Sequence, residues 1–368
     1  MNILILNWRD PANPKSGGAE TVTMEHASAW VKAGHKVTWF SSMFNGAKQI
    51  EIIRGVEVFR RGNPLTVYIL APLFYLFSKR SFDLVLDEIH GLPFLTPLYI
   101  KKPKLVLIHE VAGEIWSYMF PFPISMVGKF AESLYFKLYK KIYFWVPSKS
   151  TMDDLIKMGI KKRYIKLIND GIDNKPLTKL PIKEKTPTFI FVSRIVKMKG
   201  VEEVIKSFFF ILKELKDGNL WIVGDGDPEY IEYLKEVLRS YSISAKVKFF
   251  GRVSNAEKFK LMSKANLLLH ASRKEGWGLV VIEAASQATP SVVYDVSGLR
   301  DSVINGKTGI VITENKPESM ARAAIDLIKD NRKYNKYQNN CLAWAKRLEW
   351  DKPIKESLEL IKDVEKGI

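Results

Sequence analysis

The chain reads RKEGWGLVVIEAAS from Arg273 to Ser286, and this stretch decides the fold class. It follows a short apolar run at residues 267–270, and its second half has the composition of a buried helix. Glycines at such a strand-to-helix junction permit close approach of the backbone, and the N–H groups of the first helical turn form an anion site. The stretch therefore predicts an α/β unit that holds a diphosphate at Gly276, Trp277, Gly278 and Leu279.

Two glutamates of this stretch, Glu275 and Glu283, stand eight positions apart. We expect Glu275 to lie before the helix, beside whatever is attached to the phosphate. We expect Glu283 about one turn inside the helix, within reach of a ribose hydroxyl. The alternative is a glycine-bearing loop in which both glutamates are ordinary charges at a helix start.

Short β-rich runs alternate with longer helical patterns on both sides of this stretch, which is typical of parallel sheets covered by helices. In the first half we predict a helix over residues 20–32 and strands at residues 2–6, 36–41, 82–87, 104–109 and 142–147. In the second half we predict strands at residues 188–193, 220–223, 246–250, 267–270 and 291–294. The fold class is therefore α/β, with two successive units of similar size.

Residues 174–187 contain three prolines and no periodicity, as expected of a linker. We therefore predict an N-terminal domain over residues 1–175 and a C-terminal domain over residues 186–347. The pattern from about Pro317 onward is nearly all helical, and residues 348–368 are predicted to form a helix that packs back on the first domain.

The composition limits the class of protein. The chain has 368 residues, 46% hydrophobic and 26% charged, which is enough for more than one core and excludes collagen-like and disordered classes. The net charge of +17 favours a polyanionic partner such as phosphate, nucleic acid or an anionic membrane surface. Cys341 is the single cysteine, so the sequence excludes an internal disulfide and fits a reducing, cytoplasmic compartment.

The sequence carries no recognisable signal peptide, and its longest apolar run, Val67–Phe77, is about half the roughly 20 residues that a spanning helix needs. We therefore expect a soluble or peripheral protein. From Lys101 to Lys166 there are 13 Lys and Arg against 5 Asp and Glu, mixed with many aromatic residues. With residues 65–80, this window favours a lipid headgroup interface, and the alternative is a well-packed apolar domain with a basic surface.

Two cations, Arg194 and Lys199, follow the first strand of the second domain. Ligands bind at the carboxyl ends of strands in such sheets, and two cations there are able to hold a departing diphosphate. Arg194 offers a planar fork and Lys199 a point charge. The alternative is a solvated basic loop in which Lys197 is an equally good candidate.

In the first domain, Gly17 and Gly18 join the first strand to the first helix, where we expect them to expose N–H groups toward a cleft between the domains. A tight turn without a ligand is the alternative, because the loop is not a G-x-G-x-x-G fingerprint. His109 and Glu110 close a predicted strand, and at least one of them should project from the carboxyl edge of the sheet. His109 is then either a donor to a sugar hydroxyl or phosphate, or a hydrogen-bonded structural residue.

No metal site is predicted. Asp225 and Asp227 resemble an acidic pair, but we interpret Asp227 and Pro228 as the cap and first residue of a helix. The sequence has no other His, Asp or Glu cluster with ligand spacing, no phosphate-binding P-loop and no nucleophile elbow. It has no nucleic-acid recognition signature either, so we expect no nucleic acid partner.

Taken together, these motifs make the sequence similar to glycosyltransferase family 4. The resemblance runs through most of the chain, and its most specific part is an E-x7-E element, here Glu275 to Glu283. Further matches are the Gly17 loop, a Val-Pro-Ser run at residues 146–148, the segment Asp170-Gly-Ile-Asp173 and the terminal helix at Trp350. The resemblance implies the GT-B fold, in which two Rossmann-like parallel-sheet domains face a cleft.

The resemblance also implies an activity, the transfer of a hexose from a UDP- or GDP-linked sugar with retention of configuration and without a metal or other cofactor. Glu275 would contact the donor sugar, Glu283 the ribose, and Arg194 with Lys199 the diphosphate. Gly17 and Gly18 would shape the floor between donor and acceptor, and His109 would lie near the reacting sugar. The segment that resembles the base-packing element is Phe250, Gly251, Arg252 and Val253.

The surface of the first domain indicates which class of acceptor to expect. The aromatic and basic window leads us to expect a saccharide acceptor, possibly a lipid-linked glycan or a glycolipid at the cytosolic membrane face. Three alternatives stay open: a GT-B epimerase or phosphorylase, a non-catalytic membrane or polysaccharide-binding module, and a dinucleotide oxidoreductase, which the missing fingerprint disfavours.

Overall fold

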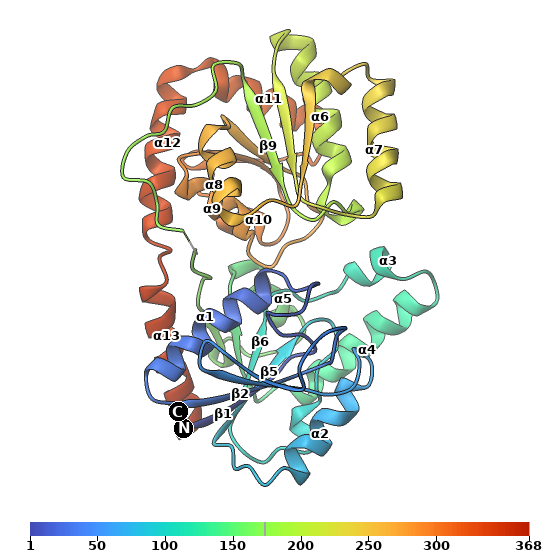
Figure 1. The fold of residues 1–368 in the computed structure, drawn as a ribbon, viewed down its shortest axis with the longest axis vertical. Helices are drawn as coiled ribbons and strands as arrows, with labels where there is room; N and C mark the ends of the chain where they lie inside the picture. The colour runs from blue at the N-terminus through green and yellow to red at the C-terminus, as the bar shows by residue number, and fades with distance from the viewer. Residues whose placement is uncertain (173, 368) are drawn as a thin grey trace. The chain divides into compact units, whose positions relative to one another are not determined.

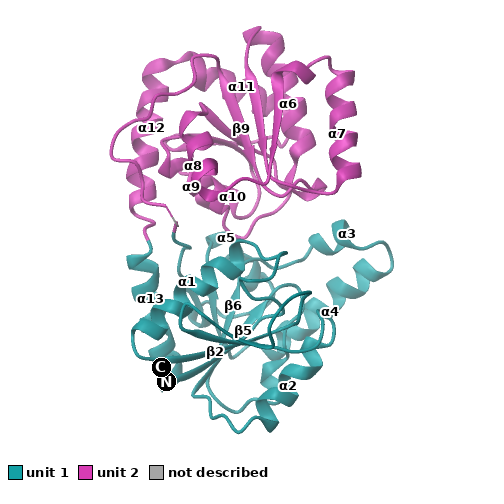
Figure 2. Cartoon of the chain, in the orientation of Figure 1, with its two compact units in different colours: residues 1–171, 350–368 teal, residues 172–349 magenta. Residues whose placement is uncertain are grey.

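The structure, a computed structural model, describes residues 1–172 and 174–367, which form two compact units (Figure 1). Unit 1 comprises Met1–Gly171 and Trp350–Ile368, and unit 2 comprises Ile172–Glu349 (Figure 2). Each unit has its own parallel sheet and its own apolar cores, as two β/α runs separated by a proline-rich linker predict. Asp173, the last residue of the predicted Asp170-Gly-Ile-Asp173 segment, lies outside the described residues.

The sheet of unit 1 has eight strands in the order β3-β4-β2-β1-β5-β6-β7-β8, all parallel except for the β3–β4 pair. The strands are β1 (Asn2–Leu6), β2 (Lys36–Ser41), β3 (Ile50–Ile53), β4 (Val56–Arg60), β5 (Leu84–Ile89), β6 (Lys104–Ile108), β7 (Tyr143–Val146) and β8 (Ile165–Leu167). The helices are α1 (Gly18–Lys32), α2 (Val67–Phe77), α3 (Ile115–Met119), α4 (Ile124–Leu138), α5 (Lys149–Lys157) and α13 (Asp351–Lys366).

The terminal helix α13 packs on unit 1, as predicted. Its apolar side places Leu360, Ile361 and Val364 in the core that also holds strands β1, β5 and β6. At its start, Trp350 lies against the chain at Gly171, where a Cβ atom would come within 2.4 Å of the indole ring. The glycine of the predicted Asp170-Gly-Ile segment is therefore required by the tryptophan that begins the returning helix.

The sheet of unit 2 has six parallel strands in the order β11-β10-β9-β12-β13-β14. The strands are β9 (Thr188–Val192), β10 (Asn219–Val223), β11 (Val247–Gly251), β12 (Leu267–His270), β13 (Ser291–Tyr294) and β14 (Gly309–Ile312). The helices are α6 (Val201–Leu215), α7 (Pro228–Ser240), α8 (Asn255–Lys264), α9 (Leu279–Ser286), α10 (Leu299–Ser302), α11 (Pro317–Lys329) and α12 (Asn331–Lys346).

All ten predicted strands occur, with ends that differ from the predicted ones by no more than two residues. The strand predicted at residues 82–87 is β5, Leu84–Ile89, and the one predicted at residues 104–109 ends at Ile108, before His109. Strands β3, β4, β8 and β14 were not predicted. In β3, β4 and β8 the apolar run is interrupted by Glu51, Glu57 and Lys166, and β14 has only four residues, the first of them a glycine. Strands β3, β8 and β14 form sheet edges and β4 lies next to one, where polar residues are tolerated.

The apolar run Val67–Phe77 forms helix α2, which is 11 residues long. Among the helices of residues 1–172 and 174–367, none combines the length and the hydropathy that crossing a membrane requires.

Candidate functional site

The sheet of unit 2 reverses its strand order between β9 and β12, and the predicted ligand residues follow these two strands. Strand β9 pairs with β10 on one side and β12 on the other, so the connections that leave β9 and β12 diverge. Ligands of open α/β sheets bind at such a switch point, outside the carboxyl ends of the strands. Lys199 lies in the connection after β9, and Glu275 lies in the connection after β12.

Glu275 is the centre of a charged contact at this switch point. Its Oε1 atom lies 2.6 Å from Nζ of Lys199 and 3.2 Å from Nε2 of His270, and its side chain is 15% exposed. Burial alone raises the pKa of this carboxyl group, but the charge of Lys199 and the hydrogen bond with His270 outweigh it and hold the pKa well below its usual range. Glu275 is therefore ionised at neutral pH, with a cation held beside it.

Gly200 allows the Lys199 loop to approach strand β12. Its φ is +71°, and a Cβ atom there would lie 2.0 Å from the backbone oxygen of Ala271. The approach is also held by the backbone N–H of Arg273, which donates to the backbone oxygen of Met198 at 2.9 Å. The position of Lys199 beside Glu275 thus depends on a residue without a side chain. The exposed Lys197, the rival candidate from the sequence, forms no ion pair within the described ranges.

Helix α9 begins directly after Gly278, which has φ +83° and would bring a Cβ atom within 2.9 Å of the Ser302 hydroxyl. The N–H of Val281 in its first turn donates to the backbone oxygen of Gly278 at 2.9 Å. The two N–H groups before it, of Leu279 and Val280, have no carbonyl partner within the helix and carry the positive end of its dipole. The side chain of Trp277 is buried in an apolar cluster with Ile282 and Cys341. The start of α9 is therefore a rigid, glycine-dependent turn that presents backbone donors, as the sequence predicted.

Glu283 lies one turn inside α9, as predicted. Its Oε1 atom is 2.6 Å from Nζ of Lys258 in helix α8, and both side chains are mostly buried. Lys258 was not predicted, because nothing in its own segment of sequence indicates a partner in α9. The two acids of the E-x7-E element are thus each matched by one lysine from another part of unit 2.

The remaining predicted residues of unit 2 lie at the same edge of its sheet. Arg194 follows β9, is exposed, and forms no ion pair with any residue of the ranges 1–172 and 174–367. Gly251 ends β11, and its backbone oxygen accepts from the N–H of Gly224 at the end of β10. The side chain of Phe250 packs edge-on against Trp221, Arg252 is exposed, and Val253 packs on the core.

In unit 1, the loop with Gly17 and Gly18 follows β1, at the corresponding reversal between β1 and β5. The predicted exposure of its N–H groups holds only in part, because the N–H of Gly17 donates to Oε2 of Glu20 at 2.7 Å. Oε1 of Glu20 accepts in turn from Arg9 at 2.8 Å. The first N–H at this helix start is therefore occupied by a side chain of the helix itself.

His109 lies directly after β6 with a side chain that is 12% exposed. Its Nε2 atom is 3.8 Å from Oε1 of Glu88, and its Nδ1 atom is 3.8 Å from Oδ2 of Asp170. Burial, with a smaller contribution from the charge of nearby His90, lowers the pKa of His109 to about 3. His109 is therefore a neutral imidazole at neutral pH. It lies between two buried carboxyl groups: that of Glu88, which was not predicted, and that of Asp170, which entered only as part of the segment Asp170-Gly-Ile-Asp173.

The buried acidic residues of β5 could have been found from the sequence. Strand β5 carries Asp87 and Glu88 among apolar residues, and charged residues are rarely fully buried without a partner. Asp87 accepts hydrogen bonds from Thr96 and Tyr139 and is structural. Glu88 instead faces His90 and Thr23, on the other side of the sheet.

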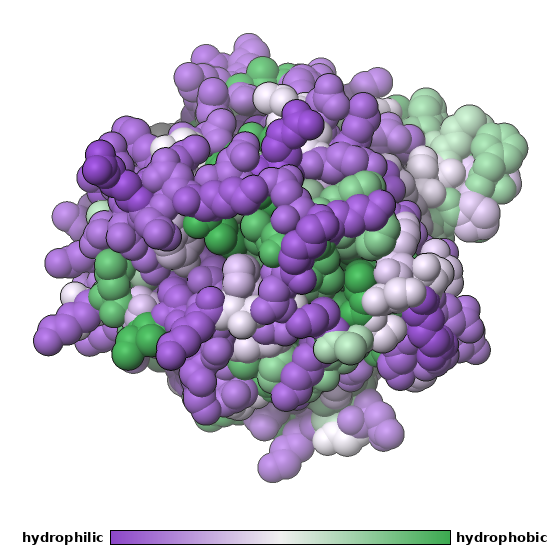
Figure 3. All heavy atoms as spheres, turned by 90° about the horizontal axis from the view of Figure 1, so that it is seen from above, coloured by the Kyte–Doolittle hydropathy of each residue, from purple (hydrophilic) through white to green (hydrophobic). Residues whose placement is uncertain are grey.

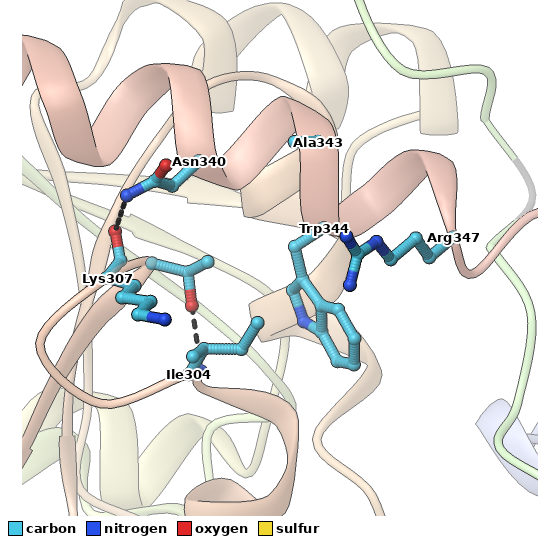
Figure 4. A pocket seen from close by; sticks show the side chains of 7 residues that line it. Ile304, Lys307, Asn340, Ala343, Trp344 and Arg347 are labelled. Carbon is cyan, nitrogen blue, oxygen red and sulfur yellow. Dashed lines mark hydrogen bonds between the residues drawn. The ribbon is translucent and has the colours of Figure 1, made fainter.

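The described residues contain no group of three or more His, Cys, Asp and Glu side chains placed to hold a metal ion. Asp227 caps helix α7 by accepting from the N–H of Glu229, with Pro228 as the first helical residue, which confirms the interpretation of this segment as a helix start. Figure 4 shows a pocket of about 230 Å³ elsewhere in unit 2, and none of the predicted donor residues lines it. Its lining comprises Ile304, Lys307, Thr308, Asn340, Ala343, Trp344 and Arg347.

The surface of unit 1 carries many large apolar side chains that are not buried. They gather on α2, on α3 and α4, and on the segment between α3 and α4, and Phe122 and Phe130 are 77% and 64% exposed. Figure 3 shows mostly hydrophilic colouring, with apolar atoms at the right-hand edge, where Figure 1 places α3 and α4. The exposed apolar residues in and directly beside these helices are Leu65, Ile69, Leu73, Leu76, Phe77, Tyr118, Met119, Phe120, Phe122, Ile124, Met126, Val127, Phe130, Leu134 and Leu138.

Known structures share this architecture. Sucrose-phosphate synthase from Thermosynechococcus elongatus matches with a TM-score of 0.82 and 18% identity, and the match covers 100% of both chains. The Anabaena protein HepE, in complex with UDP-glucose, matches with a TM-score of 0.76 and 18% identity over 99% of this chain and 100% of that chain. The two parallel Rossmann-like sheets with a terminal helix on the first unit are therefore the GT-B fold.

Sequence comparison gives the family. The family model described as "Glycosyltransferase Family 4" matches residues 16–175. The model described as "Glycosyl transferases group 1" matches residues 174–344. An uncharacterized glycosyltransferase of Methanocaldococcus jannaschii is 27% identical over 307 residues, which are 77% of this chain and 76% of that relative. The chain belongs to glycosyltransferase family 4 and is a retaining glycosyltransferase that uses a nucleotide-sugar donor.

Proposed function

We propose that this enzyme transfers a hexose from a UDP- or GDP-linked donor to a hydroxyl group of a lipid-linked glycan or glycolipid at the cytosolic face of an anionic membrane. In this proposal unit 2, Ile172–Glu349, binds the donor. Unit 1, Met1–Gly171 with Trp350–Ile368, binds the acceptor and the membrane.

The observation that carries the donor half of the proposal is the contact of Lys199, Glu275 and His270 beside the start of α9. Cleavage of the donor builds positive charge on the sugar and negative charge on the leaving diphosphate. A fixed lysine, Arg194 and the α9 amides are able to stabilise the leaving group, while ionised Glu275 orients the sugar. No metal ion is required by this arrangement, so we expect transfer to continue in the presence of EDTA.

The proposed reaction is balanced without a covalent enzyme intermediate. The bond between the sugar's C1 and the diphosphate oxygen breaks, and a bond between C1 and the acceptor oxygen forms on the same face. The hydroxyl proton of the acceptor passes to the departing diphosphate. His109, held neutral by burial, hydrogen-bonds the reacting sugar in this proposal. The segments around Gly17 and Phe250 line the donor at its sugar and base ends.

The membrane half of the proposal rests on the exposed apolar residues of α2, α3 and α4. Helix α4 buries Tyr135 and Phe136 in the core of unit 1, yet its opposite side, with Val127 and Phe130, is apolar and exposed. Soluble monomers rarely expose such a large apolar patch without a partner. Lys137, Lys140 and Lys141 at the end of α4 are exposed and match an anionic headgroup layer.

Two assays test the proposal. A panel of UDP-, GDP- and ADP-linked sugars is screened for consumption by the full chain, with and without total membrane lipid as acceptor. We expect one UDP- or GDP-sugar to be consumed faster with lipid, and a radiolabelled sugar to appear in the lipid phase. Release of an inverted free sugar nucleotide, or consumption that depends on inorganic phosphate, would instead establish an epimerase or a phosphorylase. Co-sedimentation with liposomes should increase with the fraction of anionic lipid.

A further inference from the structure

A pocket of about 230 Å³ in unit 2 is not used by the proposed donor chemistry. One of its walls is the segment between α10 and β14, which contributes Ile304, Lys307 and Thr308. The other wall is one face of α12 and its last turn (Figure 4). The lining positions of that wall, 340, 343, 344 and 347, are spaced as residues on a single helix face are. The pocket is therefore formed where a helix meets a loop, outside the motifs that carry the donor residues.

The two walls are joined by hydrogen bonds. Nδ2 of Asn340 donates to the backbone oxygen of Lys307 at 3.1 Å, and the thiol of Cys341 donates to the backbone oxygen of Thr308 at 3.1 Å. Within the loop, the backbone N–H of Ile304 donates to the hydroxyl of Thr308 at 2.9 Å (Figure 4). The loop that carries Lys307 is therefore fixed against α12, so the pocket is preformed, as sites for small molecules usually are.

An aromatic side chain, Trp344, provides an apolar surface in this pocket. Its Nε1 atom donates to the backbone oxygen of Ser302 at 3.1 Å, and it packs partly on the apolar cluster that contains Trp277 and Cys341. These contacts fix the orientation of the indole ring, while the residue remains partly exposed and lines the pocket. The C–H groups on one face of a sugar ring pack well against such a fixed aromatic surface.

The charges around the pocket are positive. Every described lining residue is neutral or basic, and the two basic ones are Lys307 and Arg347. Both are exposed, and neither forms an ion pair with a residue in the described part of the chain. In the view of Figure 4, the indole ring of Trp344 stands between their side chains. These two long, unpaired cations are therefore able to turn toward one anionic group of a ligand that lies on Trp344.

Phosphate is the anionic group that fits this arrangement best. A phosphate monoester carries about 1.5 to 2 negative charges at pH 7, which two cations balance, whereas a carboxylate carries only one. The planar fork of an arginine binds two phosphate oxygens at once, and a lysine adds a point charge. The net charge of +17 on the chain adds a long-range attraction for anions.

We propose that this pocket is a second ligand site, which binds a small sugar that carries a phosphate monoester. Arg347 and Lys307 bind the phosphate, and Trp344 packs against the sugar ring. The inference goes beyond the proposed function, because the residues assigned to the nucleotide-sugar donor do not line this pocket. A sugar phosphate and UDP therefore bind to unit 2 at the same time.

Calorimetry with the full chain and saturating UDP tests the class of ligand. UDP occupies the proposed diphosphate site at α9, so that the probes do not bind there. The probes are glucose 6-phosphate, inorganic phosphate and glucose. We expect one molecule of glucose 6-phosphate to bind per chain. The Kd should be at least about tenfold higher for inorganic phosphate, which lacks the contact with Trp344, and for glucose, which lacks the charge.

Two substitutions locate the site. Arg347→Gln and Lys307→Gln each remove one cation from the pocket and should raise the Kd for glucose 6-phosphate about tenfold, because hydrogen bonds to charged groups are the stronger ones. Lys346→Gln is the matched control, since Lys346 is an exposed neighbour of Arg347 that does not line the pocket, and it should change this Kd by less than about twofold. All three variants should keep the parent's Kd for UDP, which shows that unit 2 remains folded.

The outcomes separate this site from the donor site. Displacement of glucose 6-phosphate by UDP, or unchanged binding in both Arg347→Gln and Lys307→Gln, would show that the sugar phosphate binds elsewhere and would overturn the second site. An equal loss in Lys346→Gln would reduce the effect to general positive charge, and inorganic phosphate that binds as tightly as glucose 6-phosphate would overturn the sugar contact. The proposed function fails by a different result, the absence of nucleotide-sugar consumption by the parent chain.

Discussion

The two units hold their buried carboxyl groups in opposite ways. In unit 2, Glu275 and Glu283 each contact a lysine at 2.6 Å, and the pKa of Glu275 lies below its usual range. In unit 1, burial raises the pKa of Glu88 and Asp170, and their neighbours are histidines. An ionised acid beside a fixed cation is suited to a charged ligand, whereas an acid held toward its neutral form is suited to hydroxyl groups. In the proposed function, the arrangement in unit 2 serves the nucleotide-sugar donor.

The largest effect is expected at Lys199. Lys199→Ala removes a cation from the proposed diphosphate site and leaves Glu275 buried beside His270 alone, so we expect transfer to fall by about 100- to 1,000-fold. Steady-state rates with the selected nucleotide sugar measure the loss. Lys197→Ala is the control, because Lys197 is two residues away and exposed, and it should retain activity within twofold. Equal losses in both variants would show that the loop provides only general positive charge.

The apolar surface of α4 gives the next largest effect. Val127→Asp with Phe130→Asp places two charges on the exposed side of α4, and each large apolar side chain lost from a membrane interface costs about 1.5–3 kcal/mol. We therefore expect liposome binding to fall by about 100-fold, measured by co-sedimentation. Ile182→Asp is the control, since Ile182 is 94% exposed in unit 2. A comparable loss of liposome binding in Ile182→Asp would contradict a membrane contact that is specific to α4 of unit 1.

A third test concerns the raised pKa of Asp170. Between the pKa of an ordinary Asp near 4 and the folded value of about 8, the folded protein keeps a proton that the unfolded chain releases. The free energy of unfolding therefore falls as pH rises through this window, by up to about 1.4 kcal/mol per pH unit. Asp170→Asn should flatten this dependence in urea unfolding at pH 5 and pH 7.5. Asp326→Asn, at an exposed site, is the control, and an equal slope in parent and Asp170→Asn contradicts the account.

The smallest effect is expected at Glu283. Glu283→Gln keeps the shape of the side chain but removes the charge that faces Lys258 and the proposed ribose contact. We expect the donor KM to rise about fivefold with little change in kcat, because this contact is made equally in the ground state and the transition state. A loss confined to kcat would place Glu283 nearer to the reacting bond than the E-x7-E pattern indicates.

The fold could be predicted from the sequence because both units repeat the same pattern of an apolar strand followed by a helix. Central strands such as β1 and β12 are continuous apolar runs, and the glycine turn at Gly278 has a fixed place before α9, so each is visible in a short window. The short strands β3, β4, β8 and β14 escaped because their stability comes from neighbouring strands rather than from their own composition.

The candidate site was predictable only where its residues lie close in sequence. Glu275, Glu283 and Lys199 were found from motifs that follow particular strands. Their partners were not found, because Lys258 reaches Glu283 and Asp170 reaches His109 only through the tertiary fold. The hydrogen bond from the N–H of Gly17 to the side chain of Glu20 was not predicted either, because a pair of glycines does not indicate that Glu20 folds back onto them.

The most direct test of the central claim is a crystal structure of the full chain grown with UDP-glucose. We expect density for the diphosphate at the first turn of α9 and beside Lys199, with the sugar against Glu275 and the ribose against Glu283. Density for the nucleotide at any other place, with these four contacts empty, would contradict it.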